Sequence, residues 1–145
     1  MNSKILFTII LVTLFSFLFL IKNFTERHYL YIDNQKISLI IADSSETRIR
    51  GLSGMRKLAK DTAMLFVFDK PDKYGIWMKD MKFPIDIIWL DENQKIIYIE
   101  ENISPKTYPK VFMSDQQSLY VLETNIDFVK NYNLKVGNIL NISKK

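Results

Sequence analysis

The sequence contains no cysteine. This absence excludes disulfide bonds, thiolate catalysis, cysteine-ligated metals and a lipoprotein anchor on cysteine. There is one histidine, His28, and nothing in the sequence places it beside a serine as the base of a catalytic triad. Zinc and copper sites usually need several His or Cys ligands. With no G-x-G-x-x-G motif and no P-loop either, the sequence predicts no cofactor and no metal.

Strong charge of one sign is also missing. The chain has 20 basic and 16 acidic residues, a net charge of +4. No acidic residue precedes Glu26, and Lys4 and Lys22 flank an apolar run, so 18 basic and 16 acidic residues remain from Thr25 onward. An excess of +2 that is dispersed along the chain does not indicate a nucleic-acid surface. The sequence therefore predicts no nucleic-acid partner.

Residues 5–21 form a run of 17 residues without a charge, Gly or Pro. As a helix the run would be about 25 Å long, close to the hydrocarbon thickness of about 30 Å. Bulky or charged residues follow it, whereas signal cleavage needs small ones, so a retained signal-anchor is favoured over a cleaved signal peptide. We predict a transmembrane segment over 1–24 and one domain over 25–145, outside the cytoplasm (secreted if the segment is cleaved).

The remainder of the chain reads as short strands separated by turns. We expect strands over 28–33, 36–42, 63–69, 76–80, 85–91, 95–101, 111–113, 118–124 and 134–143. A short helix is expected after a cap at Ser44 or Ser45, a further turn at 55–59, and another helix over 125–132. These patterns predict a mainly β domain, sandwich or barrel-like, of eight or nine strands with two or three short helices. Helices do not alternate with strands, which argues against a βαβ arrangement.

Charged residues stand inside the apolar stretch at 63–91 and in the strand at 118–124. Residues 63–69 are apolar on both faces, which is typical of a central strand. Asp86 and Glu123 each lie within an otherwise apolar strand, and Lys79 follows Trp77 closely. Because an unpaired buried charge is costly, these residues need partners or a function.

Five ordered blocks of the sequence are similar to a known family. They are R-x-R-G-L-x-x-x-R-x-L, A-M-L-F-V-F, W-M-K-D-M-x-x-P-I-D-I-I-W-L-D, V-L-E and K-V-G-N. In this order and spacing the chain resembles the DUF192 family, also called UPF0127, from about residue 36 to 142. The resemblance implies a compact β-rich domain, often behind a signal or membrane segment, and implies no established activity.

The candidate site consists of Arg56, Trp77, Lys79, Asp86 and Glu123. One hypothesis is a small concave site that binds a small polar ligand or an envelope partner without catalysis, with Trp77 as an aromatic floor. A second is an envelope hydrolase, directed at glycans, in which Asp86 and Glu123 act as acid and base. A third is a purely structural or assembly module, in which the acids form ion pairs with the two cations or bind backbone groups. The sequence favours the first and does not determine oligomeric state.

A basic segment precedes this stretch. It contains Arg48, Arg50, Arg56, Lys57 and Lys60. Solvated surface cations are one interpretation. The other is a loop that presents one arginine to an anionic group.

Overall fold

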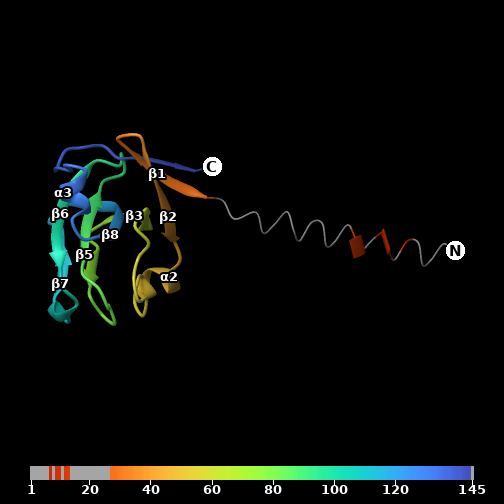
Figure 1. Ribbon diagram of the computed structural model, residues 1–145, viewed down its shortest axis with the longest axis horizontal. Helices are drawn as coiled ribbons and strands as arrows, with labels where there is room; N and C mark the ends of the chain where they lie inside the picture. Colours follow the sequence, from red (N-terminus) through yellow and green to blue (C-terminus); the bar gives the residue numbers. More distant parts are fainter. Residues whose placement is uncertain (1–6, 8, 11, 14–26, 145) are drawn as a thin grey trace.

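The computed structural model describes residues 7, 9–10, 12–13 and 27–144 (Figure 1). The predicted transmembrane segment, residues 5–21, lies largely outside this part of the chain. Within the described part, no helix is both long and apolar enough to cross a membrane. The membrane anchor and the location outside the cytoplasm stay predictions.

The described part of the chain contains nine strands. They are β1 (His28–Ile32), β2 (Gln35–Ala42), β3 (Thr62–Asp72), β4 (Gly75–Trp77), β5 (Ile85–Leu90), β6 (Ile96–Ile103), β7 (Val111–Met113), β8 (Ser118–Asn125) and β9 (Asn141–Lys144). Two short α-helices, α2 (Ser45–Arg50) and α3 (Phe128–Asn131), and one 3-10 turn, η1 (Pro105–Thr107), lie between them. The predicted β class, strand number and short helices are confirmed.

Seven strands form one sheet in the order β6-β5-β8-β3-β2-β1-β9, and β4 pairs with β7 in a separate two-stranded ribbon. The large sheet is not closed, because β6 and β9 end the order at opposite edges. The start of β6 is joined to the segment before β9 by an isolated bridge, Lys95 with Ile139, and by backbone hydrogen bonds on either side of it. The barrel-like form of the predicted fold is therefore wrong, and the sheet is open.

The sheet is mixed, because β2 and β3 are parallel. Parallel neighbours need a crossover connection, and residues 43–61, which include α2, provide it. The Ser44 side chain accepts a hydrogen bond from the Thr47 amide at 3.2 Å, which confirms the predicted helix cap. The expectation against a βαβ arrangement is wrong at this one connection. The helix is hard to recognise in the sequence because α2 has only six residues and none of them is buried. Such a short exposed helix has little periodic pattern of apolar residues.

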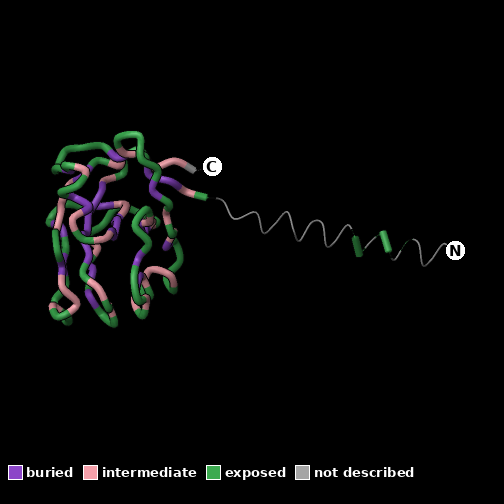
Figure 2. The backbone as a smooth tube through the Cα atoms, viewed as in Figure 1, coloured by how far each residue is buried: buried purple, intermediate pink, exposed green. Residues whose placement is uncertain are grey.

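Each face of the sheet carries a hydrophobic core. In β5 all six residues are buried (Figure 2). Along a strand, alternate side chains point to opposite faces of the sheet. Ile87 and Trp89 belong to a first core with Leu52, Ile76 and Phe112, so the segment after α2 and the β4–β7 ribbon cover that face. The second core contains side chains from β5 and β8 and from the chain that follows β8: Ile88, Leu90, Leu122, Phe128, Val129, Leu134 and Leu140. Two covered faces explain why β5 reads as a continuous apolar run.

Candidate functional site

A cavity of about 200 Å³ is lined by residues of α2, β3 and β4 and of the segments that follow α2 and β4. Figure 1 shows where α2 lies against the sheet. The walls of the cavity are largely aromatic and aliphatic: Leu52, Phe66, Phe68, Tyr74, Ile76, Trp77 and Met81. Three charged side chains also line it: Arg48, Arg50 and Glu123. A small apolar cavity with few polar groups is the usual form of a site for a small ligand.

Glu123 supplies the acid of this cavity. It lies on β8 between Met64 of β3 and Ile87 of β5, and it is 4% exposed. Its Oε2 atom is buried and has no hydrogen-bond partner. Burial raises the pKa of Glu123 to about 8, because the apolar surroundings disfavour the charged carboxylate. The side chain is therefore mostly protonated at pH 7. Buried polar atoms without partners are rare in proteins, and this one belongs to a side chain that lines a cavity.

Gly51 leaves room above the Glu123 carboxyl. A Cβ atom at Gly51 would lie 3.8 Å from Glu123 Oε2 and 3.2 Å from Phe66 Cζ. The backbone there has φ 49° and ψ −135°, a conformation that L side chains rarely adopt. Position 51 therefore favours glycine for two reasons: its backbone conformation, and the close approach of the Phe66 ring.

We expect Gly51→Ala to lower the free energy of unfolding by about 1–3 kcal/mol, from backbone strain and the contact with Phe66. Gly54→Ala is the matched control, because Gly54 also has a positive φ, of 78°, but a Cβ there meets nothing within 4 Å. Urea denaturation of both variants gives the comparison. Equal losses of stability in the two variants would show that the contact between a Cβ at position 51 and Phe66 costs nothing.

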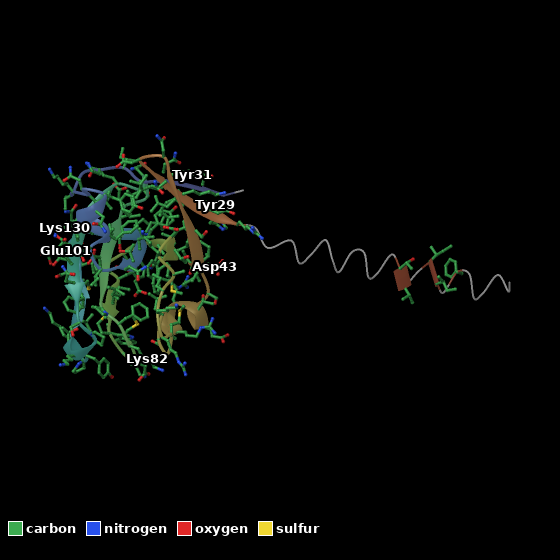
Figure 3. The ribbon with its side chains drawn as sticks, in the orientation of Figure 1. Tyr29, Tyr31, Asp43, Lys82, Glu101 and Lys130 are labelled. Atoms are coloured by element: carbon green, nitrogen blue, oxygen red, sulfur yellow. The ribbon has the colours of Figure 1, made fainter. Side chains whose placement is uncertain are left out.

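Arg48 forms a fixed wall of the cavity. Its Nη1 donates to the carbonyl oxygens of Asp43 at 2.6 Å and Val67 at 2.7 Å. Its Nη2 lies 3.5 Å from Asp69 Oδ2, and the guanidinium is 5.4 Å from the ring centroid of Phe68. Figure 3 labels Asp43 beside α2. These contacts tie the start of the crossover to β3 and leave the Arg48 charge already partnered.

Two aromatic rings continue this wall. The rings of Phe68 and Tyr74 stack with centroids 3.4 Å apart and planes within 5°. The Tyr74 hydroxyl donates to the Lys70 carbonyl at 2.8 Å, and the Trp89 indole N–H donates to the Tyr74 carbonyl at 2.9 Å. Tyr74 is thus held from both its side chain and its backbone, and the wall is preorganised.

An exposed apolar surface adjoins the mouth of the cavity. Trp77 is 46% exposed and pairs across the ribbon with Val111, which is 50% exposed. Met113, 49% exposed, lies opposite Gly75 on the same face. A Cβ on Gly75 would be only 2.5 Å from Val111 Cγ1, so the Val111 side chain occupies that space. The ribbon therefore extends the apolar wall beyond the cavity itself.

Of the five residues predicted for the site, the structure brings only Trp77 and Glu123 to the cavity. Arg56 and Lys79 are exposed and do not line it. The strand expected over 76–80 ends at Trp77, because Asp80 adopts a left-handed turn with φ 56°. Lys79 takes part through its backbone, whose carbonyl accepts a hydrogen bond from Ser53 Oγ at 2.8 Å.

Asp86 lies on the other face of the sheet. Ile87 is the partner of Glu123 and Asp86 is the partner of Thr124, so Asp86 and Glu123 point to opposite faces. Asp86 is fully buried, and its carboxylate accepts hydrogen bonds from the Asn102 amide at 2.8 Å and the Val129 amide at 3.1 Å. Asp86 therefore holds β6 and α3 in place by binding backbone groups, as the structural hypothesis expected. It forms no acid pair with Glu123.

The predicted ion pairs are not formed either. Within residues 27–144 the one salt bridge joins Arg48 and Asp69. Arg48 was predicted only as one of five basic residues and not as a site residue. Tyr74, in the turn between two expected strands, was not predicted for the site either. The available signal was weak: Phe68 shares a face with Phe66 in the expected strand, and Arg48 precedes the Gly51 motif by three residues.

These features define a class: an open, mixed β-sheet domain with an aromatic cavity above a buried carboxyl group. Comparison with protein-family models gives the family. The DUF192 model, described as an uncharacterized ACR, matches residues 29–142. The chain belongs to the DUF192 family, which confirms the resemblance drawn from its motifs.

Solved structures share this fold. A proposed transcription regulator from Sinorhizobium meliloti 1021 is 27% identical with a TM-score of 0.72, over 82% of this chain and 92% of that one. A protein of unknown function from Novosphingobium aromaticivorans DSM 12444 is 21% identical with a TM-score of 0.71, over 81% and 83%. A search of curated proteins found no match.

Proposed function

We propose that this domain binds a small ligand in the cavity above Glu123 and does not catalyse a reaction on it. The observation that carries the proposal is the Glu123 side chain, which lines the cavity and whose buried Oε2 atom has no hydrogen-bond partner. A ligand group that bonds this atom would remove an unsatisfied polar atom from the interior. The cavity volume of about 200 Å³ suits one ring or one short chain, below the range of about 300–1,000 Å³ typical of drug-sized ligands.

The geometry supports binding better than hydrolysis. Glycoside hydrolysis needs two carboxyl groups flanking one bond. Glu123 is the one acid among the described residues that line the cavity, and Asp86 points to the opposite face. His28 lies on β1, three strands from β8 in the sheet order, and does not line the cavity.

Tryptophan fluorescence of the full-length chain tests the proposal. The compounds to screen are sugars, amino acids, nucleotides and small amines. Trp77 lines the cavity and is 46% exposed, whereas Trp89 is fully buried, so a bound ligand should change the emission of Trp77. The Trp77→Phe variant assigns the signal.

For any compound that responds, Trp77→Ala should weaken binding roughly tenfold in calorimetry, since a buried aromatic contact contributes about 1–2 kcal/mol. Tyr108→Ala is the control, because Tyr108 is a comparably exposed aromatic, at 48%, that does not line the cavity. Equal effects of the two changes, or the absence of any binding compound, would contradict the proposal.

A further inference from the structure

We propose that the group which enters this cavity is a small organic cation, an ammonium or methylated ammonium carried on a short apolar body. The inference rests on the proposed function and names the class of its ligand. Three features carry it: an acid without a partner, aromatic walls in the cavity that this acid lines, and an apolar surface outside the mouth.

The first feature is the missing partner of Glu123. A carboxylate buried in apolar surroundings is stabilised most by a nearby cation. The Arg48 side chain lines the same cavity, but its guanidinium is already bonded to two backbone carbonyls and to Asp69. Arg50 is exposed, so water screens its charge. The positive charge that would complement Glu123 is therefore left for the ligand to supply.

The second feature is the aromatic wall. The faces of aromatic rings carry negative potential and attract cations, most strongly for tryptophan. The wall already shows this interaction, because the Arg48 guanidinium lies over the Phe68 ring at 5.4 Å. Phe66 and Trp77 are further rings that line the same cavity as Glu123. Aromatic rings around an acid are the usual surroundings for a bound ammonium group.

The third feature is the apolar surface at the mouth. Ile49 lines the cavity and is 71% exposed. On the β4–β7 ribbon, Trp77 also lines the cavity, and Trp77, Val111 and Met113 are each about half exposed. A ligand with an ammonium head and a short hydrocarbon or aromatic body could bury this surface while its head reaches Glu123. A fully hydrophilic cation would leave it exposed.

The acid gives the inference a distinctive pH dependence. The side chains that face Glu123 from β3 and β5 are the apolar Met64 and Ile87, and the titratable groups lining the cavity are Arg48, Arg50 and Tyr74. With the pKa of Glu123 raised by burial to about 8, roughly a tenth of the side chains are ionised at pH 7 and nine-tenths at pH 9. A cation of fixed charge should therefore bind about tenfold more tightly at pH 9 than at pH 7.

Calorimetric titration of the full-length chain tests this with three aromatic probes: benzyltrimethylammonium, neutral benzamide and anionic benzoate. We expect the ammonium probe to bind most tightly, to gain about tenfold in affinity from pH 7 to pH 9, and to release a proton from the protein at pH 7. Glu123→Gln keeps the side-chain volume and should abolish both the pH dependence and the proton release. Glu101→Gln, at an exposed position of β6, is the charge-matched control and should change neither.

The outcomes separate the inference from the proposed function. If benzamide or benzoate binds in a Trp77-dependent way and the ammonium probe does not, the cation assignment is wrong while a ligand site remains. Ammonium binding that is unchanged in Glu123→Gln would also overturn the inference. If none of these probes and no compound of the fluorescence screen binds, both are wrong.

Discussion

Glu123→Gln is expected to make the ligand-free protein more stable than the wild type at pH 8, by about 1–3 kcal/mol once the cost of burying its unpartnered amide N–H groups is included. The cause is the buried carboxyl, whose pKa rises from 4.5 to about 8 on folding through loss of solvation. In the unfolded chain the group ionises above pH 4.5, whereas in the folded protein it ionises only around pH 8. Glutamine has nearly the same shape and never ionises, so the variant avoids this penalty.

The sign follows from the two pKa values. Below pH 4.5 both states are protonated and the carboxyl carries no penalty. Between pH 4.5 and about 8 the folded protein holds a proton that the unfolded chain has lost, so stability falls as pH rises and levels off above pH 8. The difference of 3.5 pKa units corresponds to a loss on the order of 5 kcal/mol over the whole window.

Urea denaturation at pH 5, 6.5 and 8 measures this effect. The wild type should lose stability steadily across the series, and Glu123→Gln should lose much less. Glu101→Gln, which removes an exposed carboxylate, should follow the wild type within about 0.5 kcal/mol. Parallel pH profiles for the wild type and Glu123→Gln would show that the buried carboxyl has a partner or ready access to water.

Asp86→Ala is expected to destabilise the protein by about 3 kcal/mol or more. The change removes the acceptor for the amides of Asn102 and Val129, and an unsatisfied buried donor costs about 1–3 kcal/mol. A cavity in the second core adds to the loss. Asp86→Asn keeps one acceptor oxygen and should lose roughly half as much. Hydrogen exchange at the Val129 amide should become faster in both variants.

Asp91→Ala is the matched control for this change. Asp91 also accepts two backbone hydrogen bonds, from Asn93 at 2.8 Å and Lys95 at 3.0 Å, but it lies in a partly exposed turn. Water can replace its carboxylate, so a loss of about 1 kcal/mol is expected. A loss at Asp86 no larger than that at Asp91 would contradict the assignment of Asp86 as an internal support.

The local patterns predicted much of the fold. Alternating Ile37, Leu39 and Ile41 indicated a strand with one buried face, which β2 is, although Leu39 and Ile41 are only partly buried. The apolar run after Thr62 predicted a central strand, and β3 lies between β8 and β2. Ser44 was one of two proposed helix caps and caps α2. These features are readable because they depend on neighbours within a few residues along the chain.

The sequence by itself determined that Glu123 is a charged residue type inside an otherwise apolar strand. It also determined that Trp77 lies close to Lys79 along the chain. Only the tertiary structure decided where these side chains lie relative to one another. Pairing Ile87 with Glu123 separates Asp86 from Glu123 by a sheet, and a register one residue different would have put them on one face. The crossover through α2 brings Arg48 and Gly51 to the cavity. The register of the strands and the path of the crossover depend on the packing of the whole sheet. A pattern of neighbouring residues therefore does not predict them.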